Sequence, residues 1–462
     1  MARVELLLVA WDGVSPEMVS QLMGEGTLPS LREMLGGSRI LRLQSTIPPI
    51  TAPAWASFHL GVNPGKHGIL DFVRRRAGER PHLVSSRDLP YPTFWEILAE
   101  EVPVGFLAFP LGYPARPLRR GFWVPGFLAP ANAASHPKEA SGLARKAGYS
   151  PNPPAWFPGR RWVEDLKGSI RAKTEAALAL TRRFQPVVLG IHYQETDTVQ
   201  HFLWGKPEVD EVFSAADAAL ATLLEELSPR TVVLLSDHGM GPVRWDFHLN
   251  TWLLREGLLV LRRGLSTWAR KGLFDLGLSP RRFQGLGERA ASLFGRIFQR
   301  SSLDLVWHWS DLGAKLSLSF RDVDWEKTPV YSPGGLGTLS RNGRSRIDLD
   351  ELCERLFGLR TPEGETVVER IFPREELYWG ERVRDMPDLV FLTKGMEVLP
   401  VTSSLFLSHR PFCPPSVPGH HRLEGFLAAL PHQGFREGMP IWGIAPVILS
   451  SFGISPPDYM DV

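Results

Sequence analysis

Two pairs of acidic and imidazole side chains have spacings that suit a metal site. Asp197 and His201 are four residues apart, so in a helix both project from one face. Asp237 and His238 are adjacent and precede Gly239, which permits a tight turn that lets both side chains converge. Carboxylate oxygens and imidazole nitrogens are ligands of divalent ions. A purely structural role is the alternative for each pair. Asp197 could cap a helix while His201 lies on the surface, and Asp237 could cap backbone N–H groups in a turn.

Three further residues, with a carboxylate, a hydroxyl and an imidazole, could take part in such a site. Asp12 follows an apolar run, Thr51 precedes an alanine-rich segment, and His421 lies in the sequence GHHR after a proline-rich loop. Asp12 and Thr51 also fit helix N-caps, the latter with Pro53 in the first turn, and the histidine fits a solvated loop. A hydroxyl at a helix N-terminus lies at the positive end of the helix dipole, which favours both an alkoxide and a phosphate.

Alternating strands and helices are predicted to position these groups. Apolar runs predict buried parallel strands at residues 4–10, 104–109, 187–192 and 231–236. Amphipathic segments predict helices at residues 15–24, 93–101, 166–184 and 208–227. This order predicts an α/β fold with a doubly wound, mostly parallel sheet between helical layers. Because ligands of such sheets bind at the carboxyl ends of the strands, the acidic groups that follow three strands should meet there.

Two regions interrupt the alternation. Residues 110–165 are rich in Pro, Gly and Trp and are predicted to form a long ordered loop. Residues 253–320 have a helical pattern and predict an inserted cap, which divides the core into residues 1–252 and 321–462. Residues 262–300 of this cap contain nine Arg and Lys but two acidic residues. The excess indicates either a solvated helical face or a surface that attracts anionic substrates or anionic lipid head groups.

Composition narrows the classes of function. Lys+Arg 52 against Asp+Glu 50 gives a net charge of +2, which does not indicate a nucleic-acid-binding protein, and no specific nucleic-acid motif is found. Two cysteines, Cys353 and Cys413, are too few for a disulfide framework and suit a reducing compartment. We find neither a signal-peptide pattern nor an apolar window of about 18 residues, so a cytoplasmic protein is expected.

Read together, these motifs resemble the alkaline phosphatase superfamily and, within it, the type I phosphodiesterase/nucleotide pyrophosphatase branch. The similarity rests on Asp12-Gly13, TIPPITAPAWASF, GVNPGKHGILDF, SDHGMGP and HRLEG, in this order along the chain. It is strongest to a group of predicted phosphohydrolases or phosphomutases and leaves only the cap poorly matched. The resemblance implies an alkaline-phosphatase-like fold.

The resemblance also implies two metal ions that clamp a phosphoryl group. It assigns three residues to one ion: Asp197, His201 and His421. It assigns four residues to the other: Asp12, Thr51, Asp237 and His238. These ligand types suit Zn²⁺, with Mn²⁺ as the alternative. Thr51 would attack phosphorus and form a phosphothreonine that water then hydrolyses.

The chain departs from the relatives at two points. The Asn with which nucleotide pyrophosphatases hold the phosphate corresponds to Phe72, which disfavours nucleotide diesters as substrates. Lys66 and His67 would contact substrate oxygens instead, or else are a solvated lysine and a histidine that caps a turn. Thr51 stands where sulfatases carry the Cys or Ser precursor of formylglycine, which disfavours sulfate esters.

We therefore predict a two-metal phosphoesterase. Diester hydrolysis is favoured because the motifs align best with the phosphodiesterase branch. The enzymatic alternatives are a phosphomonoesterase and a phosphomutase, in which the phosphothreonine returns its group to another hydroxyl. The non-enzymatic alternative is a metal-bearing scaffold that binds phosphorylated ligands or an anionic surface. The presence of all the expected site residues favours catalysis, whereas the oligomeric state is not predicted.

Overall fold

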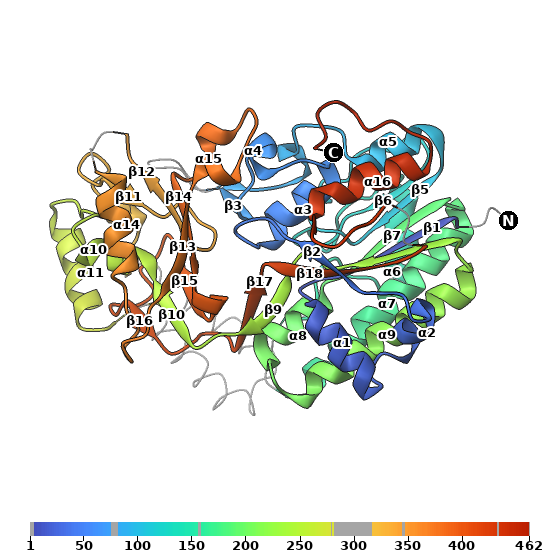
Figure 1. Cartoon of the computed structure of the whole chain (residues 1–462), viewed down its shortest axis with the longest axis horizontal. Helices are drawn as coiled ribbons and strands as arrows, with labels where there is room; N and C mark the ends of the chain where they lie inside the picture. Colours follow the sequence, from blue (N-terminus) through green and yellow to red (C-terminus); the bar gives the residue numbers. More distant parts are fainter. Residues whose placement is uncertain are drawn as a thin grey trace.

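An eight-stranded sheet forms the centre of the larger of two lobes (Figure 1). Its strands are, in spatial order, β19 (Met439–Pro440), β2 (Leu41–Gln44), β18 (Glu424–Leu430), β8 (Thr231–Leu235), β1 (Leu6–Trp11), β7 (Val188–Tyr193), β5 (Val104–Leu107) and β6 (Gly121–Val124). The five strands from β8 to β6 run parallel, and β18 is antiparallel to both neighbours. The predicted mostly parallel α/β sheet is confirmed. The computed structural model describes residues 4–74, 82–155, 159–278, 280, 317–343, 347–431 and 434–461.

Helices cover both faces of this sheet because its central strands are apolar on both sides. Leu7, Val9 and Trp11 of β1 face one cluster, whereas Leu6, Leu8 and Ala10 face another. The first face is covered by α1 (Pro16–Glu25), α2 (Pro29–Leu35), α6 (Lys138–Lys146), α7 (Arg160–Phe184), α8 (Glu195–Leu203) and α9 (Pro207–Leu227). The second face is covered by α3 (Thr51–Leu60), α5 (Phe94–Glu101) and α16 (Ile444–Ser451).

The smaller lobe has its own sheets and its own apolar core (Figure 1). One sheet contains β15 (Val398–Val401), β10 (Trp245–His248) and β16 (Phe412–Cys413). The other contains β11 (Val330–Tyr331), β12 (Thr338–Arg341), β14 (Leu389–Thr393) and β13 (Val368–Pro373). Its helices include α10 (Leu249–Arg255), α11 (Leu265–Asp275) and α14 (Leu349–Phe357), and α15 (Arg374–Leu377) follows β13.

The chain enters the smaller lobe through β9 (Gly239–Pro242) and returns through β17 (Gly419–Arg422), and these two strands pair antiparallel. The segment between them is longer than the predicted cap at 253–320, because the described strands from β10 to β16 pair with one another and not with the large sheet. Apolar patterns reveal that a strand forms but do not specify its sheet. The division into a core of 1–252 and 321–462 therefore differs from the lobes seen here.

Much of the predicted cap lies outside the described residues, including Arg281, Arg282, Arg289, Arg296 and Arg300. Basic side chains of the cap that lie within the described residues make local contacts. Arg270 pairs with Asp322, Lys271 pairs with Asp275 at 2.6 Å, and Arg262 donates to the Val323 carbonyl. Attraction of anionic surfaces by residues 262–300 stays a prediction.

Residues 110–165 contain more regular structure than the predicted loop. They include β6, α6 and the start of α7. Phe122 and Trp123 of β6 are fully buried, so this edge strand contributes to the cores on both sheet faces. The three residues between Gly121 and Pro125 give too short an apolar run to be recognised as a strand. None of the described helices combines the length and apolar character needed to cross a bilayer.

Candidate metal centre

Three carboxylates meet where adjacent strands of the large sheet end. The register pairs Trp11 with Tyr193 and Ala10 with Leu235, so β1, β7 and β8 end at one edge. Asp12, Asp197 and Asp237 follow these strand ends and are buried. The predicted convergence of the acidic groups at the carboxyl ends of the strands is thus what the structure shows.

Neither Asp12 nor Thr51 serves as a helix cap. Helix α1 is capped by Ser15, whose Oγ accepts a hydrogen bond from the Met18 N–H at 3.3 Å. Helix α3 has Ile50 as its N-cap, so Thr51 is its first residue and not the predicted N-cap. Both side chains are therefore available to the site, and the Thr51 hydroxyl lies at the positive end of α3.

The first group of ligand atoms comes from α8 and β17. His201 Nε2 lies 3.3 Å from Asp197 Oδ1, and His421 Nε2 lies 3.4 Å from the same oxygen. The two Nε2 atoms are 3.1 Å apart. Tetrahedral Zn²⁺ with bonds of about 2.0–2.1 Å separates its ligand atoms by about 3.4 Å. The three atoms therefore have spacings that fit one ion.

The second group surrounds His238 Nε2. This atom lies 3.2 Å from Thr51 Oγ1, 3.4 Å from Asp237 Oδ2 and 3.6 Å from Asp12 Oδ1. All four residues are buried. The two groups adjoin, because the His238 and His421 rings stack with centroids 3.6 Å apart. The structure therefore brings together all seven residues predicted as metal ligands.

Backbone carbonyls orient the three imidazoles. Nδ1 of His201 lies 2.9 Å from the Gly419 oxygen, Nδ1 of His238 lies 3.0 Å from the Gly239 oxygen, and Nδ1 of His421 lies 2.9 Å from the Pro49 oxygen. A carbonyl oxygen only accepts, so each Nδ1 carries a hydrogen, and in the neutral ring each Nε2 presents a lone pair. Lone pairs of His201 and His421 at 3.1 Å repel each other unless a cation lies between them.

The three carboxylates show the complementary pattern. Within the described residues, Asp12 Oδ1, Asp197 Oδ1 and Asp237 Oδ2 are buried without a hydrogen-bond partner. The opposite oxygens accept bonds from Trp55 Nε1 and His192 Nε2 for Asp12, from Gln194 Nε2 for Asp197, and from the Gly13 N–H for Asp237. Buried unpartnered carboxylate oxygens are costly. The unpartnered oxygens are the ones that face the Nε2 atoms, and this arrangement fits divalent cations.

The electrostatics of the site also favour added positive charge. Burial raises the pKa of Asp12 well above its ordinary value, and Asp197 raises it further. Burial, with the nearby Asp12 and Asp197, does the same to the pKa of Asp237. Burial also acts to raise the pKa of Asp197, but the charged forms of His201 and His421 together hold it well below the usual range. Bound cations would stabilise all three ionised carboxylates.

A glycine is required beside the first carboxylate. Gly13 has φ of +70°, and a Cβ there would lie 2.8 Å from Asp197 Oδ1. Any other side chain would therefore displace Asp197 Oδ1, which explains the Asp-Gly sequence at the end of β1.

Sequence reasoning missed the two side chains that hold Asp12. Trp55 Nε1 and His192 Nε2 bind Asp12 Oδ2 at 3.1 and 2.7 Å, and both residues are fully buried. Each had a signal in the sequence. Trp55 lies one helical turn after Thr51, and His192 is a polar residue within a buried apolar strand.

Lys66, His67 and Phe72 make contacts with residues other than the seven predicted ligands. Lys66 Nζ donates to the Tyr459 carbonyl at 2.8 Å and to Asp461 at 2.6 Å. His67 Nδ1 accepts from the Ile69 N–H at 3.0 Å, as in a turn cap, and burial lowers its pKa to about 3. The Phe72 ring lies edge-on to Phe127. Contact of these three residues with a substrate remains a prediction.

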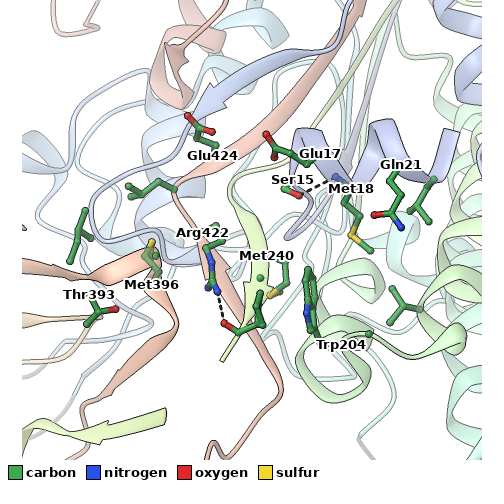
Figure 2. Close-up of a pocket in the computed structure, with 18 of the residues that line it drawn as sticks. Ser15, Glu17, Met18, Gln21, Trp204, Met240, Thr393, Met396, Arg422 and Glu424 are labelled. Carbon is green, nitrogen blue, oxygen red and sulfur yellow. Dashed lines mark hydrogen bonds between the residues drawn. The ribbon is translucent and has the colours of Figure 1, made fainter. Parts of the chain in front are cut away.

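The β9–β17 ribbon that carries His421 also borders a cavity of about 1140 Å³ (Figure 2). Met18, Trp204, Met240, Met396 and Arg422 are among its lining residues, whereas the seven ligands are not. Arg422 donates to the carbonyls of His420 and His421 at 3.0 Å and to that of Pro242. These bonds fix the ribbon and so the position of His421.

The family model for type I phosphodiesterase / nucleotide pyrophosphatase matches residues 6–289. The chain belongs to this family. Type I phosphodiesterases and nucleotide pyrophosphatases are metal-dependent hydrolases that act on phosphate esters. Membership of the family establishes this chain as a phosphoric ester hydrolase. A search among curated proteins found no matching relative.

Solved structures support the fold of this phosphodiesterase-family chain. Phosphonoacetate hydrolase from Sinorhizobium meliloti 1021, in complex with phosphonoacetate, has 17% identity and a TM-score of 0.61 over 96% of this chain and 94% of that chain. Murine ectonucleotide pyrophosphatase/phosphodiesterase 5 has 12% identity and a TM-score of 0.53 over 98% and 96%. An inactive variant of the murine protein, with one threonine replaced by alanine, is similar in complex with AMP at a TM-score of 0.54. These similarities confirm the alkaline-phosphatase-like fold.

Proposed function

We propose that this enzyme is a two-metal phosphodiesterase that acts through a covalent intermediate on Thr51. The observation that carries the proposal is the convergence of three unpartnered carboxylate oxygens with the lone pairs of three carbonyl-anchored imidazoles, beside the Thr51 hydroxyl. Asp197, His201 and His421 would hold one ion, and Asp12, Thr51, Asp237 and His238 the other. The mixture of imidazole and carboxylate ligands suits Zn²⁺, and Mn²⁺ is the second candidate.

Two bound divalent ions would supply positive charge that stabilises the attacking and leaving oxygens of an in-line displacement. The chain contributes the nucleophile and its position. Thr51 Oγ1 is 3.2 Å from His238 Nε2 and 3% of Thr51 is exposed, so the hydroxyl is held in a site largely shielded from water. The N-terminus of α3 adds free N–H groups that favour an anion.

In the proposed reaction, Thr51 Oγ1 forms a bond to phosphorus while the bond from phosphorus to the leaving oxygen breaks. The hydroxyl loses its proton, and the leaving oxygen gains one. Water then attacks the phosphothreonine, which releases a phosphomonoester and restores the Thr51 hydroxyl. The inactive threonine-to-alanine variant of the murine neighbour supports a threonine nucleophile in this fold.

The test combines metal analysis with a substrate panel. Protein purified without chelator should contain up to two equivalents of Zn²⁺ or Mn²⁺. The metal-loaded enzyme should hydrolyse bis(p-nitrophenyl) phosphate faster than p-nitrophenyl phosphate, a phosphonate ester or p-nitrophenyl sulfate. Less than one equivalent of metal, with no increase in activity on adding metal, would refute the two-metal site. A preference for the monoester would refute the diesterase assignment.

A further inference from the structure

A fourth histidine lies beside the two groups of ligand atoms, and no role was assigned to it above. The His420 ring has centroid distances of 5.0 Å to the His201 ring and 4.4 Å to the His421 ring. One of its nitrogens lies within 4.8 Å of the ligand atoms of both neighbours. By distance alone, His420 would therefore qualify as a metal ligand.

Hydrogen bonding distinguishes His420 from the three predicted ligands. Its Nδ1 accepts a hydrogen bond from the backbone N–H of His421 at 2.8 Å. An acceptor nitrogen carries no hydrogen, so a neutral His420 ring carries its hydrogen on Nε2. This is the tautomer opposite to that of His201, His238 and His421, whose Nδ1 atoms face carbonyl oxygens.

The same bond determines where the ring lies. Successive side chains of a strand point to opposite faces, so His420 and His421 of β17 would ordinarily diverge. The bond to the next N–H instead brings the His420 ring over the following peptide and close to the His421 ring. His420 is partly exposed, and among the described residues none accepts a hydrogen bond from its Nε2.

These contacts make His420 a hydrogen-bond donor that has no free lone pair with which to bind a metal ion. Nε2 carries a hydrogen, and the Nδ1 lone pair is already used. The oxygens of a phosphoryl group are anionic acceptors, which such a donor binds well.

We infer that His420 is a substrate-binding residue that donates a hydrogen bond from Nε2 to a phosphoryl oxygen of a substrate bound beside Asp197, His201 and His421. The inference rests on the proposed function, since it needs a phosphoryl group at the metal site. The bond would strengthen phosphate binding without contributing to metal binding.

The test measures metal content and phosphate binding separately. His420→Ala and His420→Gln are compared with wild type and with His201→Gln, which removes a predicted ligand. Metal is quantified after purification, and the dissociation constant of inorganic phosphate is measured by calorimetry on the metal-loaded proteins. His420→Ala should keep the wild-type metal content but bind phosphate about tenfold or more weakly, the loss expected for a charge-assisted hydrogen bond. His420→Gln keeps an N–H donor and should restore most of the affinity, whereas His201→Gln should lose metal.

Two outcomes would overturn the inference. If His420→Ala loses metal as His201→Gln does, His420 is a ligand. If His420→Ala keeps both the metal and the wild-type phosphate affinity, Nε2 makes no contact with the phosphoryl group. Wild-type protein that binds neither metal nor phosphate would instead refute the proposed function. Because His420 is partly exposed, both variants are expected to fold, and their circular dichroism spectra check this.

Discussion

His192 Nε2 lies 2.7 Å from Asp12 Oδ2, although the two residues are 180 positions apart in the chain. Trp55 Nε1 binds the same oxygen at 3.1 Å. Together these donors occupy one oxygen of the carboxylate and leave Oδ1 to face His238. Side chains that orient ligands in this way raise metal affinity because they restrict the ligand to its binding geometry.

Removing either donor should therefore weaken metal binding. We expect Trp55→Phe and His192→Phe to lower metal affinity by about 10- to 100-fold, measured by competition with a chromophoric chelator. The matched control is Trp123→Phe, because Trp123 is equally buried but donates to the Gly112 carbonyl at 2.7 Å. Equal losses of metal affinity in Trp55→Phe and Trp123→Phe would indicate a general loss of packing.

The Thr51 hydroxyl should be indispensable for turnover but not for most metal binding. We expect Thr51→Ala to lower kcat by at least about 10³-fold, since the nucleophile is removed. Thr51→Ser should keep partial activity, and mass spectrometry of the quenched wild-type reaction should detect phosphate on Thr51. Near wild-type rates in Thr51→Ala would show that water attacks phosphorus directly.

Chelation should destabilise the fold, because it leaves buried carboxylates without positive charge. We expect EDTA to lower the melting temperature of wild-type protein by several degrees. Asp237→Asn removes one of the repelling carboxylates, so in EDTA the variant should have a higher melting temperature than wild type. Adding metal should raise the melting temperature of the variant less than that of wild type. If EDTA leaves the melting temperature of wild-type protein unchanged, the metal centre is contradicted.

Two buried histidines away from the ligands predict a pH dependence of stability. Burial lowers the pKa of His59 to about 3, and it does the same for His67. Between the unfolded pKa of about 6.5 and the folded pKa of about 3, the unfolded chain binds more protons. The free energy of unfolding should therefore fall as the pH falls through this window, by up to about 1.4 kcal/mol per pH unit for each histidine.

Urea unfolding of His59→Gln at several pH values checks this slope. The variant should lose less stability between pH 6.5 and pH 4 than wild type, because glutamine does not titrate. His82→Gln is the control, since the His82 side chain is 48% exposed. Parallel pH profiles for wild type and His59→Gln would rule out a contribution from His59.

The types of the groups in the candidate site and the edge at which they meet could be predicted from the chain alone. Apolar runs followed by Asp12, Asp197 and Asp237 predict strands that end together, because parallel strands share one carboxyl edge. The four-residue spacing of Asp197 and His201 predicts a common helix face. These are local properties, since the period of side chains along a strand or helix follows from backbone geometry.

The contacts that complete the site depend on packing between distant segments. His421 reaches the site because β17 pairs with β9 in one register, and Asp12 is oriented by Trp55 and His192 from α3 and β7. Likewise, the Nε2 hydrogen of His420 follows from one bond to its neighbour's N–H. The periodicity of one segment reveals neither its pairing partner nor the tautomer of a histidine, because both result from which surfaces and polar groups meet once the two lobes are folded.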